Sequence, residues 1–151
     1  MRKTIFTLLG IVMVAVTAMA AVSPIADDER AIKYKDLPAE ARSFIAKHFP
    51  NEQPSYVTEE RELTYTEYKV VMDSGMELDF DNKGEWIEVD CHYTSVPDDI
   101  VPEKILDYVR KHYPESKIVE ISKESKGWEI KITGGLELSF DKMYRLTNVD
   151  N

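Results

Sequence analysis

The chain has 151 residues, 43% of them hydrophobic and 31% charged, with 19 lysines and arginines against 28 aspartates and glutamates. This length fits one compact unit or two very small ones, and it excludes a large multidomain enzyme. The formal net charge of −9 opposes the attraction that nucleic-acid phosphates and anionic lipids require. We therefore expect no nucleic-acid partner.

The N-terminus has the pattern of a secretory signal peptide. Arg2 and Lys3 precede an apolar run over residues 5–16, and Ala18-Met19-Ala20 supplies the small residues that a signal peptidase requires, so we expect cleavage after Ala20. An uncleaved membrane anchor is the alternative, although the run is shorter than the ~20 residues that span a bilayer. No cysteine follows the run at the expected cleavage site, so lipid attachment is not expected. We predict a periplasmic or secreted protein that does not stay in the membrane.

Cys91 is the only cysteine and cannot form an intramolecular disulfide. A hydrophobic core must therefore supply the stability. Cys91 beside His92 also suggests a nucleophile with its base, but neighbouring residues in an extended segment point to opposite faces. We interpret Cys91 as a partly buried structural thiol.

Two pairs of segments in the chain are similar to each other. Residues 38–50 align with residues 102–114 at an offset of 64, sharing both prolines and a Lys-His dipeptide. Residues 74–81 align with residues 134–141 at an offset of 60 and are identical at five of eight positions. The change of offset predicts a four-residue insertion in the first repeat, at the turn around residues 59–64. Two pairs of similar segments in the same order and at nearly the same offset indicate an internal repeat.

Each repeat is predicted to hold one helix followed by four strands. Apolar residues recur at helical spacing over residues 38–50 and 102–114, with prolines that suit a helix start and force its end. Alternating apolar and polar residues predict hairpins over 68–80 and 128–140, with weaker strands at 55–58, 86–90, 117–122 and 146–149. The predicted fold class is α+β: two tandem repeats, each a helix packed on a four-stranded antiparallel sheet meander with one sheet face open.

Four motifs together are typical of one protein family: Leu37-Pro38 and Val101-Pro102, the two helices ending in Lys-His-aromatic-Pro, the strand Glu77-Leu78-Asp79-Phe80-Asp81 and the turn Gly84-Glu85-Trp86. They resemble the PepSY-like family of secreted bacterial proteins. The resemblance runs from about Lys35 to the end of the chain. It implies the fold of the beta-lactamase inhibitor protein, kinship with peptidase-inhibiting propeptide domains, and a protein-binding sheet.

The signal-peptide pattern and the resemblance together divide the chain into a signal peptide (1–20), an N-terminal segment (21–34) and two PepSY-like repeats (35–92 and 93–151). The second repeat has Lys142-Met143-Tyr144 where the first has Asn82-Lys83-Gly84. Because that turn lacks its glycine, we expect it to be looser or differently shaped.

Signals for an enzyme or a metal site are weak. The histidines His48, His92 and His112 are scattered without the spacing of a zinc site. His48 and His112 occupy equivalent positions near the predicted helix ends, and we interpret both as packing residues. We predict no enzyme, with no catalytic or cofactor-binding residues and no cofactor.

The acidic segment Asp79-x-Asp81-x-Lys83-Gly84 only faintly resembles a calcium loop, because lysine stands where the third oxygen ligand belongs. We interpret Glu77, Asp79 and Asp81 as the solvated face of a strand. The sequence therefore predicts no metal ligands.

The uncovered sheet face is the candidate binding surface. With a three-residue loop over residues 82–84, Trp86 falls on the core side with Phe80, and Ile87 and Val89 point outward; a two-residue loop reverses these faces. An ordinary solvated sheet is the alternative to a binding surface. The predicted protein-binding face contains Lys69, Val71, Glu77, Asp79, Trp86, Ile87 and Val89.

We therefore expect a secreted or periplasmic, non-enzymatic protein-binding module, of which an inhibitor of an extracytoplasmic enzyme is one form. The acidic charge suggests a partner protein with a basic surface. The alternatives are an envelope-associated structural module and a small metal-binding or hydrolytic protein.

Overall fold

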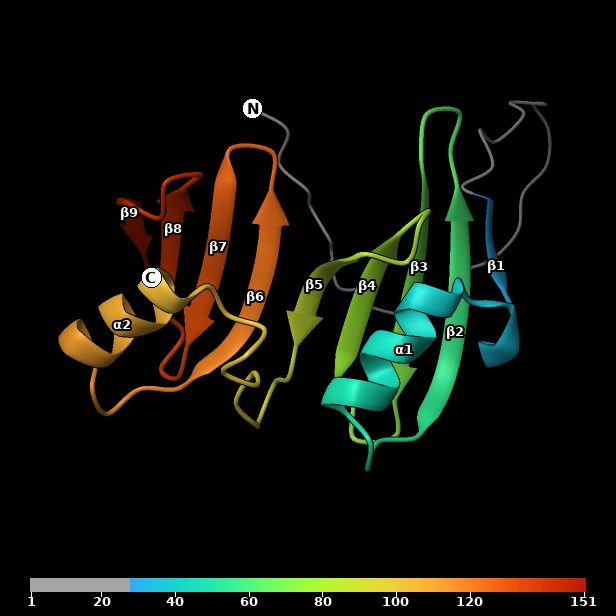
Figure 1. Cartoon of the computed structure of the whole chain (residues 1–151), viewed down its shortest axis with the longest axis horizontal. Helices are drawn as coiled ribbons and strands as arrows, with labels where there is room; N and C mark the ends of the chain where they lie inside the picture. The colour runs from blue at the N-terminus through green and yellow to red at the C-terminus, as the bar shows by residue number, and fades with distance from the viewer. Residues whose placement is uncertain (1–27) are drawn as a thin grey trace, which may run out of the picture.

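A nine-stranded antiparallel sheet is the framework of the protein (Figure 1). The computed structural model describes residues 28–151, so the predicted signal peptide lies outside the described residues. Each strand pairs with the next one along the chain. The strands are β1 (Asp28–Ala31), β2 (Pro54–Arg61), β3 (Thr66–Met72), β4 (Glu77–Asp81), β5 (Trp86–Asp90), β6 (Ile118–Glu124), β7 (Gly127–Ile132), β8 (Glu137–Asp141) and β9 (Leu146–Asp150).

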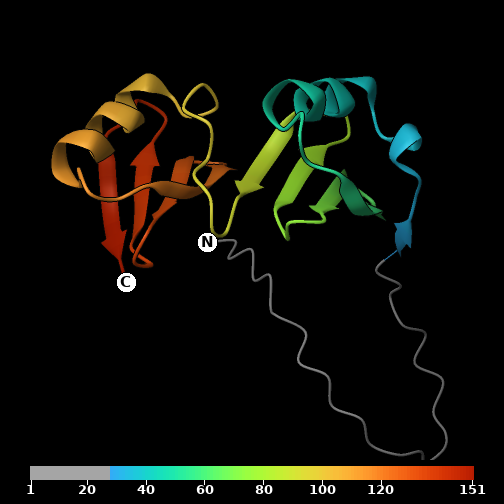
Figure 2. The same cartoon turned by 90° about the horizontal axis from the view of Figure 1, so that it is seen from below.

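Two ten-residue helices, α1 (Ala39–His48) and α2 (Glu103–His112), lie on the same side of the sheet (Figure 2). Pro38 and Pro102 are the residues that precede them, and their extended backbone starts each helix. A short 3₁₀ turn, η1 (Tyr34–Asp36), leads from β1 into α1. No helix within residues 28–151 has the length and apolar character needed to span a membrane.

The hydrophobic core lies between the helices and the sheet. Ala41 and Ile45 of α1 and Ile105 and Val109 of α2 are buried. Beneath them the sheet contributes one apolar side chain from every second position of its strands, as the predicted alternation requires. The fully buried sheet residues include Val70, Leu78, Phe80, Val89, Ile121, Ile130 and Leu138.

The expected pair of four-stranded sheets is wrong, because the structure has a single sheet. β5 pairs with β6 at Glu88–Ser122, Val89–Ile121 and Asp90–Glu120, which satisfies the N–H and C=O groups that two free sheet edges would expose. β1 adds a ninth strand beside β2. The α+β class and the order of one helix followed by four strands are observed.

A β-bulge in β5 decides which side chains face the helices. Asp79 pairs with Glu88 and Phe80 pairs with Trp86, which leaves Ile87 without a partner on β4. The extra residue reverses the alternation once, so Trp86 and Val89 both face the helices. Val89 is fully buried, and the expectation that Val89 points outward is therefore wrong.

The turn that lacks glycine keeps the shape of its counterpart, contrary to expectation. Asp81 Oδ1 accepts hydrogen bonds from the N–H groups of Lys83 and Glu85, and Asp141 Oδ1 accepts them from Met143 and Arg145. Gly84 has φ +85° and Tyr144 has φ +63°. The aspartate side chain holds the turn, and packing of the Tyr144 ring 6.2 Å from the Trp128 ring compensates for the strain that a left-handed non-glycine residue carries.

The predicted four-residue insertion lies in the β2–β3 hairpin. β2 and β3 have eight and seven residues, whereas β6 and β7 have seven and six. The remaining two residues lengthen the turn over residues 62–65, where Leu63 is entirely exposed. The hairpin projects beyond its neighbours in the sheet (Figure 1).

Candidate binding face

The face of the sheet opposite the helices carries a grid of polar side chains, here called the open face. Because side chains alternate along a strand, the pairing register also arranges them in rows across the sheet. One row contains Tyr56, Val71, Glu77, Asp90, Glu120, Lys131, Glu137 and Asp150, and the adjacent row contains Thr58, Lys69, Asp79, Glu88, Ser122, Glu129, Ser139 and Asn148.

Five carboxylates gather at the centre of these two rows. We call Glu77, Asp79, Glu88, Asp90 and Glu120 the central lattice. They come from three adjacent strands, and Glu77–Asp90, Asp79–Glu88 and Asp90–Glu120 are directly opposite each other. Like charges in such positions repel and cost stability.

Four of the seven predicted face residues do lie together on the open face: Lys69, Val71, Glu77 and Asp79. Trp86 and Val89 instead face the helices, and Ile87 is half-buried at the bulge. The predicted apolar group therefore shrinks to Val71, whose neighbour across β2 is the exposed Tyr56. The open face is predominantly acidic.

Lys69 is the cation at one edge of the central lattice. Its Nζ donates a hydrogen bond to Glu77 Oε2 at 2.9 Å and lies 3.9 Å from Asp79 Oδ1. Burial lowers the pKa of Lys69, but the charges of Asp79, Glu77 and Glu88 outweigh this effect, and the net pKa is raised. Lys69 is therefore a stable positive charge in a negative field.

Asp79 is the most buried carboxylate of the lattice, with 8% of its surface exposed. Within residues 28–151, no donor lies within hydrogen-bonding distance of its Oδ1. Burial raises the pKa of Asp79 to about 7, Lys69 opposes the shift, and Glu77, Glu67 and Glu60 add to it. A buried, ionised carboxylate oxygen without a donor is costly.

Glu88 on β5 and Glu120 on β6 are also partly buried carboxylates whose pKa values are raised. Burial raises the pKa of Glu88 to about 8, and the charges of Asp79, Glu120 and Asp90 contribute. Burial and Asp90 also raise the pKa of Glu120, although Lys131 opposes them from 3.5 Å. Lys131 Nζ lies at 3.4 Å from Glu137 as well, so it is shared between two carboxylates.

The residues around Cys91 do not form a nucleophilic site. Cys91 is buried as predicted, and burial raises the pKa of its thiol to about 11, so the reactive thiolate is scarce at neutral pH. The His92 side chain contacts Asp90 instead: its Nδ1 lies 3.0 Å from Asp90 Oδ2. The backbone N–H of His92 donates a hydrogen bond to Asp90 Oδ1.

The other two histidines pack against aromatic rings. His48 lies 4.6 Å from the Phe44 ring, and His112 lies 4.3 Å from the Tyr108 ring. His48 Nδ1 also lies 3.2 Å from Asp99, in the segment that leads to α2. No three histidine, cysteine, aspartate or glutamate side chains within residues 28–151 are grouped so that they could hold a metal ion.

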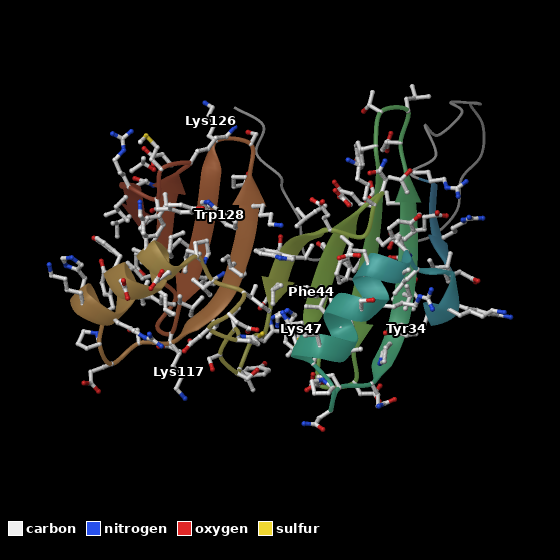
Figure 3. The ribbon with its side chains drawn as sticks, in the orientation of Figure 1. Tyr34, Phe44, Lys47, Lys117, Lys126 and Trp128 are labelled. Atoms are coloured by element: carbon white, nitrogen blue, oxygen red, sulfur yellow. The ribbon has the colours of Figure 1, made fainter. Side chains whose placement is uncertain are left out.

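The helix side of the sheet has an aromatic seam that runs from Phe44 to Trp128, the two of its residues labelled in Figure 3. Phe44 of α1 stacks 6.2 Å from Trp86, and Trp86 lies 6.0 Å from Trp128. Lys123 Nζ lies 3.9 Å from the centre of the Trp86 ring, a cation–π contact. Trp86, assigned to the binding face in the prediction, therefore belongs to this seam.

The predicted binding face did not include Glu88, Asp90 and Glu120, although the two-residue-loop alternative turned Glu88 and Asp90 outward. Their alternation within β5 and β6 was visible, but their meeting depends on the β5–β6 pairing, which joins residues from two segments that looked separate. Recognising the bulge at Ile87 would have placed Glu88 and Asp90 opposite Asp79 and Glu77.

Comparison with known proteins identifies relatives of the chain. A family model described as "Putative beta-lactamase-inhibitor-like, PepSY-like" matches residues 66–148. No curated protein matches the sequence.

Three solved structures are similar to this chain over most of its length. A periplasmic protein from Bacteroides vulgatus is 36% identical with a TM-score of 0.80, covering 83% of this chain and 99% of its own. A protein from Bacteroides thetaiotaomicron described as a "putative calcium-regulated periplasmic protein" is 37% identical with a TM-score of 0.79, covering 83% and 98%. A second B. vulgatus periplasmic protein, of unknown function, is 34% identical with a TM-score of 0.78, covering 82% and 99%.

None of these descriptions indicates an enzymatic activity, and all three structures are described as periplasmic proteins. The family match runs from the start of β3 into β9 and includes the central lattice. The chain therefore belongs to the PepSY-like family, as its helix and strand motifs suggested.

Proposed function

We propose that the protein is an exported, non-enzymatic module that binds a partner protein with a basic surface on its open face. The observation that carries this proposal is the central lattice, in which five carboxylates on three adjacent strands face away from the helices. Lys69 and Lys131 flank the lattice and offset only part of its charge. A basic partner relieves the remaining repulsion and is steered toward the face by its field.

The size of the open face suits a protein partner. Nine strands spaced ~4.8 Å apart span about 38 Å across the sheet. Strands of four to eight residues give a surface comparable to the ~800 Å² that each partner buries in a standard interface. A small-molecule site would instead need a concave, mostly apolar pocket.

Inhibition of an extracytoplasmic enzyme is the form of binding that the family description suggests. The family model is described as beta-lactamase-inhibitor-like. An inhibitor needs a rigid surface and no reactive groups, which agrees with the inert thiol of Cys91. In this proposal the partner is an enzyme that presents lysine and arginine side chains around its substrate cleft.

The signal-peptide pattern of residues 1–20 and the periplasmic descriptions of the relatives support export. We expect the exported protein to begin at Ala21. Intact mass spectrometry of material from the periplasm of a bacterial host tests this start, and a membrane-bound product that retains Met1 would contradict it.

We also infer that residues 35–92 and 93–151 are two copies of one unit. The four bulges support this inference, because they fall at matching places in β2 and β6 and in β5 and β9. The edge-to-face contacts of Phe44 with Phe80 and of Tyr108 with Phe140, at 5.7 and 5.4 Å, support it as well. The Asp81 and Asp141 turns are a third correspondence.

The test of function compares two variants with equal net charge. Glu77→Gln with Glu120→Gln removes two charges from the central lattice, and Glu40→Gln with Asp107→Asn removes two from the exposed surfaces of the helices. A partner is captured from envelope extract, purified, and its affinity for each variant is measured across salt concentrations.

We expect the lattice variant to bind at least tenfold more weakly and with a smaller salt dependence. The helix variant should bind as the wild type does. Equal affinities for both variants would refute the assignment of the open face.

A further inference from the structure

The pair Asp79 and Glu88 stands out within the central lattice. The two residues are directly opposite each other on β4 and β5, where side chains are about 5 Å apart at Cβ. Asp79 is buried, and Glu88 is more than half buried. Two ionised carboxylates in such a position are strongly disfavoured.

The donors around the pair do not compensate for two negative charges. Lys69 is the nearest cation: it donates a hydrogen bond to Glu77 Oε2 and forms an ion pair with Asp79 Oδ1 at 3.9 Å, so its single charge is shared between two carboxylates. Ser122 of β6 pairs with Glu88 and carries no charge. The charged groups that act on the pair are Glu60 (β2), Glu67 and Lys69 (β3), Glu77 (β4), Asp90 (β5) and Glu120 (β6).

A proton on one of the two carboxyls removes one charge. It also turns one oxygen of the pair into a donor, in a place where Asp79 Oδ1 has no hydrogen-bond donor among residues 28–151. The raised pKa values of Asp79, to about 7, and Glu88, to about 8, agree with this geometry. They are properties of the coupled pair.

We propose that Asp79 and Glu88 share one proton at neutral pH, and that a lysine or arginine side chain of the partner docks over the pair by displacing that proton into solvent. The identity of the docking group rests on the proposed function, whereas the protonation of the pair does not. The cation then supplies the positive charge and the donors that the proton supplied before. Capture of a basic partner is thereby coupled to pH.

The protonation is tested by a ¹³C NMR titration of the side-chain carboxyls in the purified protein, with Asp79→Asn and Glu88→Gln used for assignment. We expect the pair to titrate near neutrality, well above the ordinary range near 4. Asp141, whose pKa is lowered by hydrogen bonds from Arg145, serves as the control in the same spectra. Complete ionisation of both carboxyls by about pH 5 overturns the proposal.

The displacement is tested with a pentalysine peptide as the probe. As pH falls below the midpoint of the pair, the affinity of the peptide should fall by close to tenfold for each pH unit, because one proton is displaced for each peptide bound. Glu88→Gln should bind the peptide with little dependence on pH. Glu124→Gln, an equal charge change at the exposed end of β6, should keep the wild-type slope.

The two measurements separate the failure of this inference from the failure of the proposed function. Peptide binding with no pH dependence overturns the displacement and leaves a basic partner in place. A pair that titrates near neutrality in a protein that binds no peptide at pH 8 overturns the docking step together with the basic-partner proposal.

Discussion

The indole rings of Trp86 and Trp128, the only tryptophans in the chain, lie 6.0 Å apart across the junction of β5 and β6. Trp86 belongs to the strand before α2, and Trp128 belongs to β7. Lys123 of β6 lies over the Trp86 ring in a cation–π contact. The helix side of the junction is therefore held by side chains as well as by backbone pairing.

Replacing Trp86 by alanine should lower the free energy of unfolding by about 2–4 kcal/mol, because a large half-buried ring is lost from the junction. Urea unfolding followed by far-UV circular dichroism measures the change. Tyr93→Ala, which removes an exposed aromatic ring, is the control and should change stability by less than about 0.5 kcal/mol. A near-UV spectrum unaltered by Trp86→Ala would show that the two indoles do not interact.

Replacing Phe44 by alanine should lower the free energy of unfolding by about 2–4 kcal/mol. The Phe44 ring contacts Phe80, Trp86 and His48 at centroid distances of 5.7, 6.2 and 4.6 Å, but it is only half-buried, which reduces the loss below that of a full core residue. Tyr108→Ala should behave similarly, through Phe140. Thermal melting tests both, and a Phe44→Ala midpoint within a degree or two of wild type would remove Phe44 from the core.

Gly84→Ala should destabilise the protein by more than Gly75→Ala. Both glycines have φ near +85°, so alanine pays ~1 kcal/mol of backbone strain at either site. At Gly84 the new Cβ would also lie 2.8 Å from the Ala41 nitrogen and the Pro38 Cβ, whereas at Gly75 it meets nothing within 4 Å. Equal losses in chemical denaturation would show that α1 shifts without resistance.

Glu59→Gln should destabilise the protein at pH 7 by about 1–2 kcal/mol. Burial opposes ionisation of Glu59, but hydrogen bonds from Arg61 and Arg30 outweigh it, and its pKa is lowered. The stabilisation is therefore present above the ordinary glutamate pKa and is lost as pH falls through the folded-state pKa.

Stability measured from pH 7 to pH 3 should consequently show the Glu59→Gln and wild-type curves converging at the acid end. Glu29→Gln, an exposed change on the neighbouring strand β1, is the control. If the difference in unfolding free energy between wild type and Glu59→Gln stayed constant from pH 7 to pH 3, Glu59 would stabilise the protein through its packing and not through its charge.

Local patterns in the sequence were enough for the helices and hairpins. Pro38 and Pro102 placed both helix starts, and alternation around Leu78 and Leu138 identified the central strands. Strand β1 was missed, because its residues Asp28–Ala31 are mostly charged and alternate no apolar side chains. It is a strand only because the edge of β2 offers it partners.

The candidate site was predicted only in part, because the pairing register of β4 with β5 could not be predicted from the sequence. Glu77 and Asp79 could be placed on an outward strand face from alternation alone. One unpaired residue, Ile87, changed the face of Val89 and brought Glu88 opposite Asp79. The position of a bulge depends on tertiary packing, which here includes the burial of Trp86 against Phe44.

The three residue pairs that join β5 to β6 also make each half of the sheet a specific receptor for the other. A chain cleaved in the loop between β5 and α2 would leave two fragments, each ending in a strand that is complementary to the other in hydrogen bonding and in its apolar side, Val89 against Ile121. We expect such fragments to recognise each other by strand addition. The protein is in this sense two strand-complementary halves joined by one covalent connection.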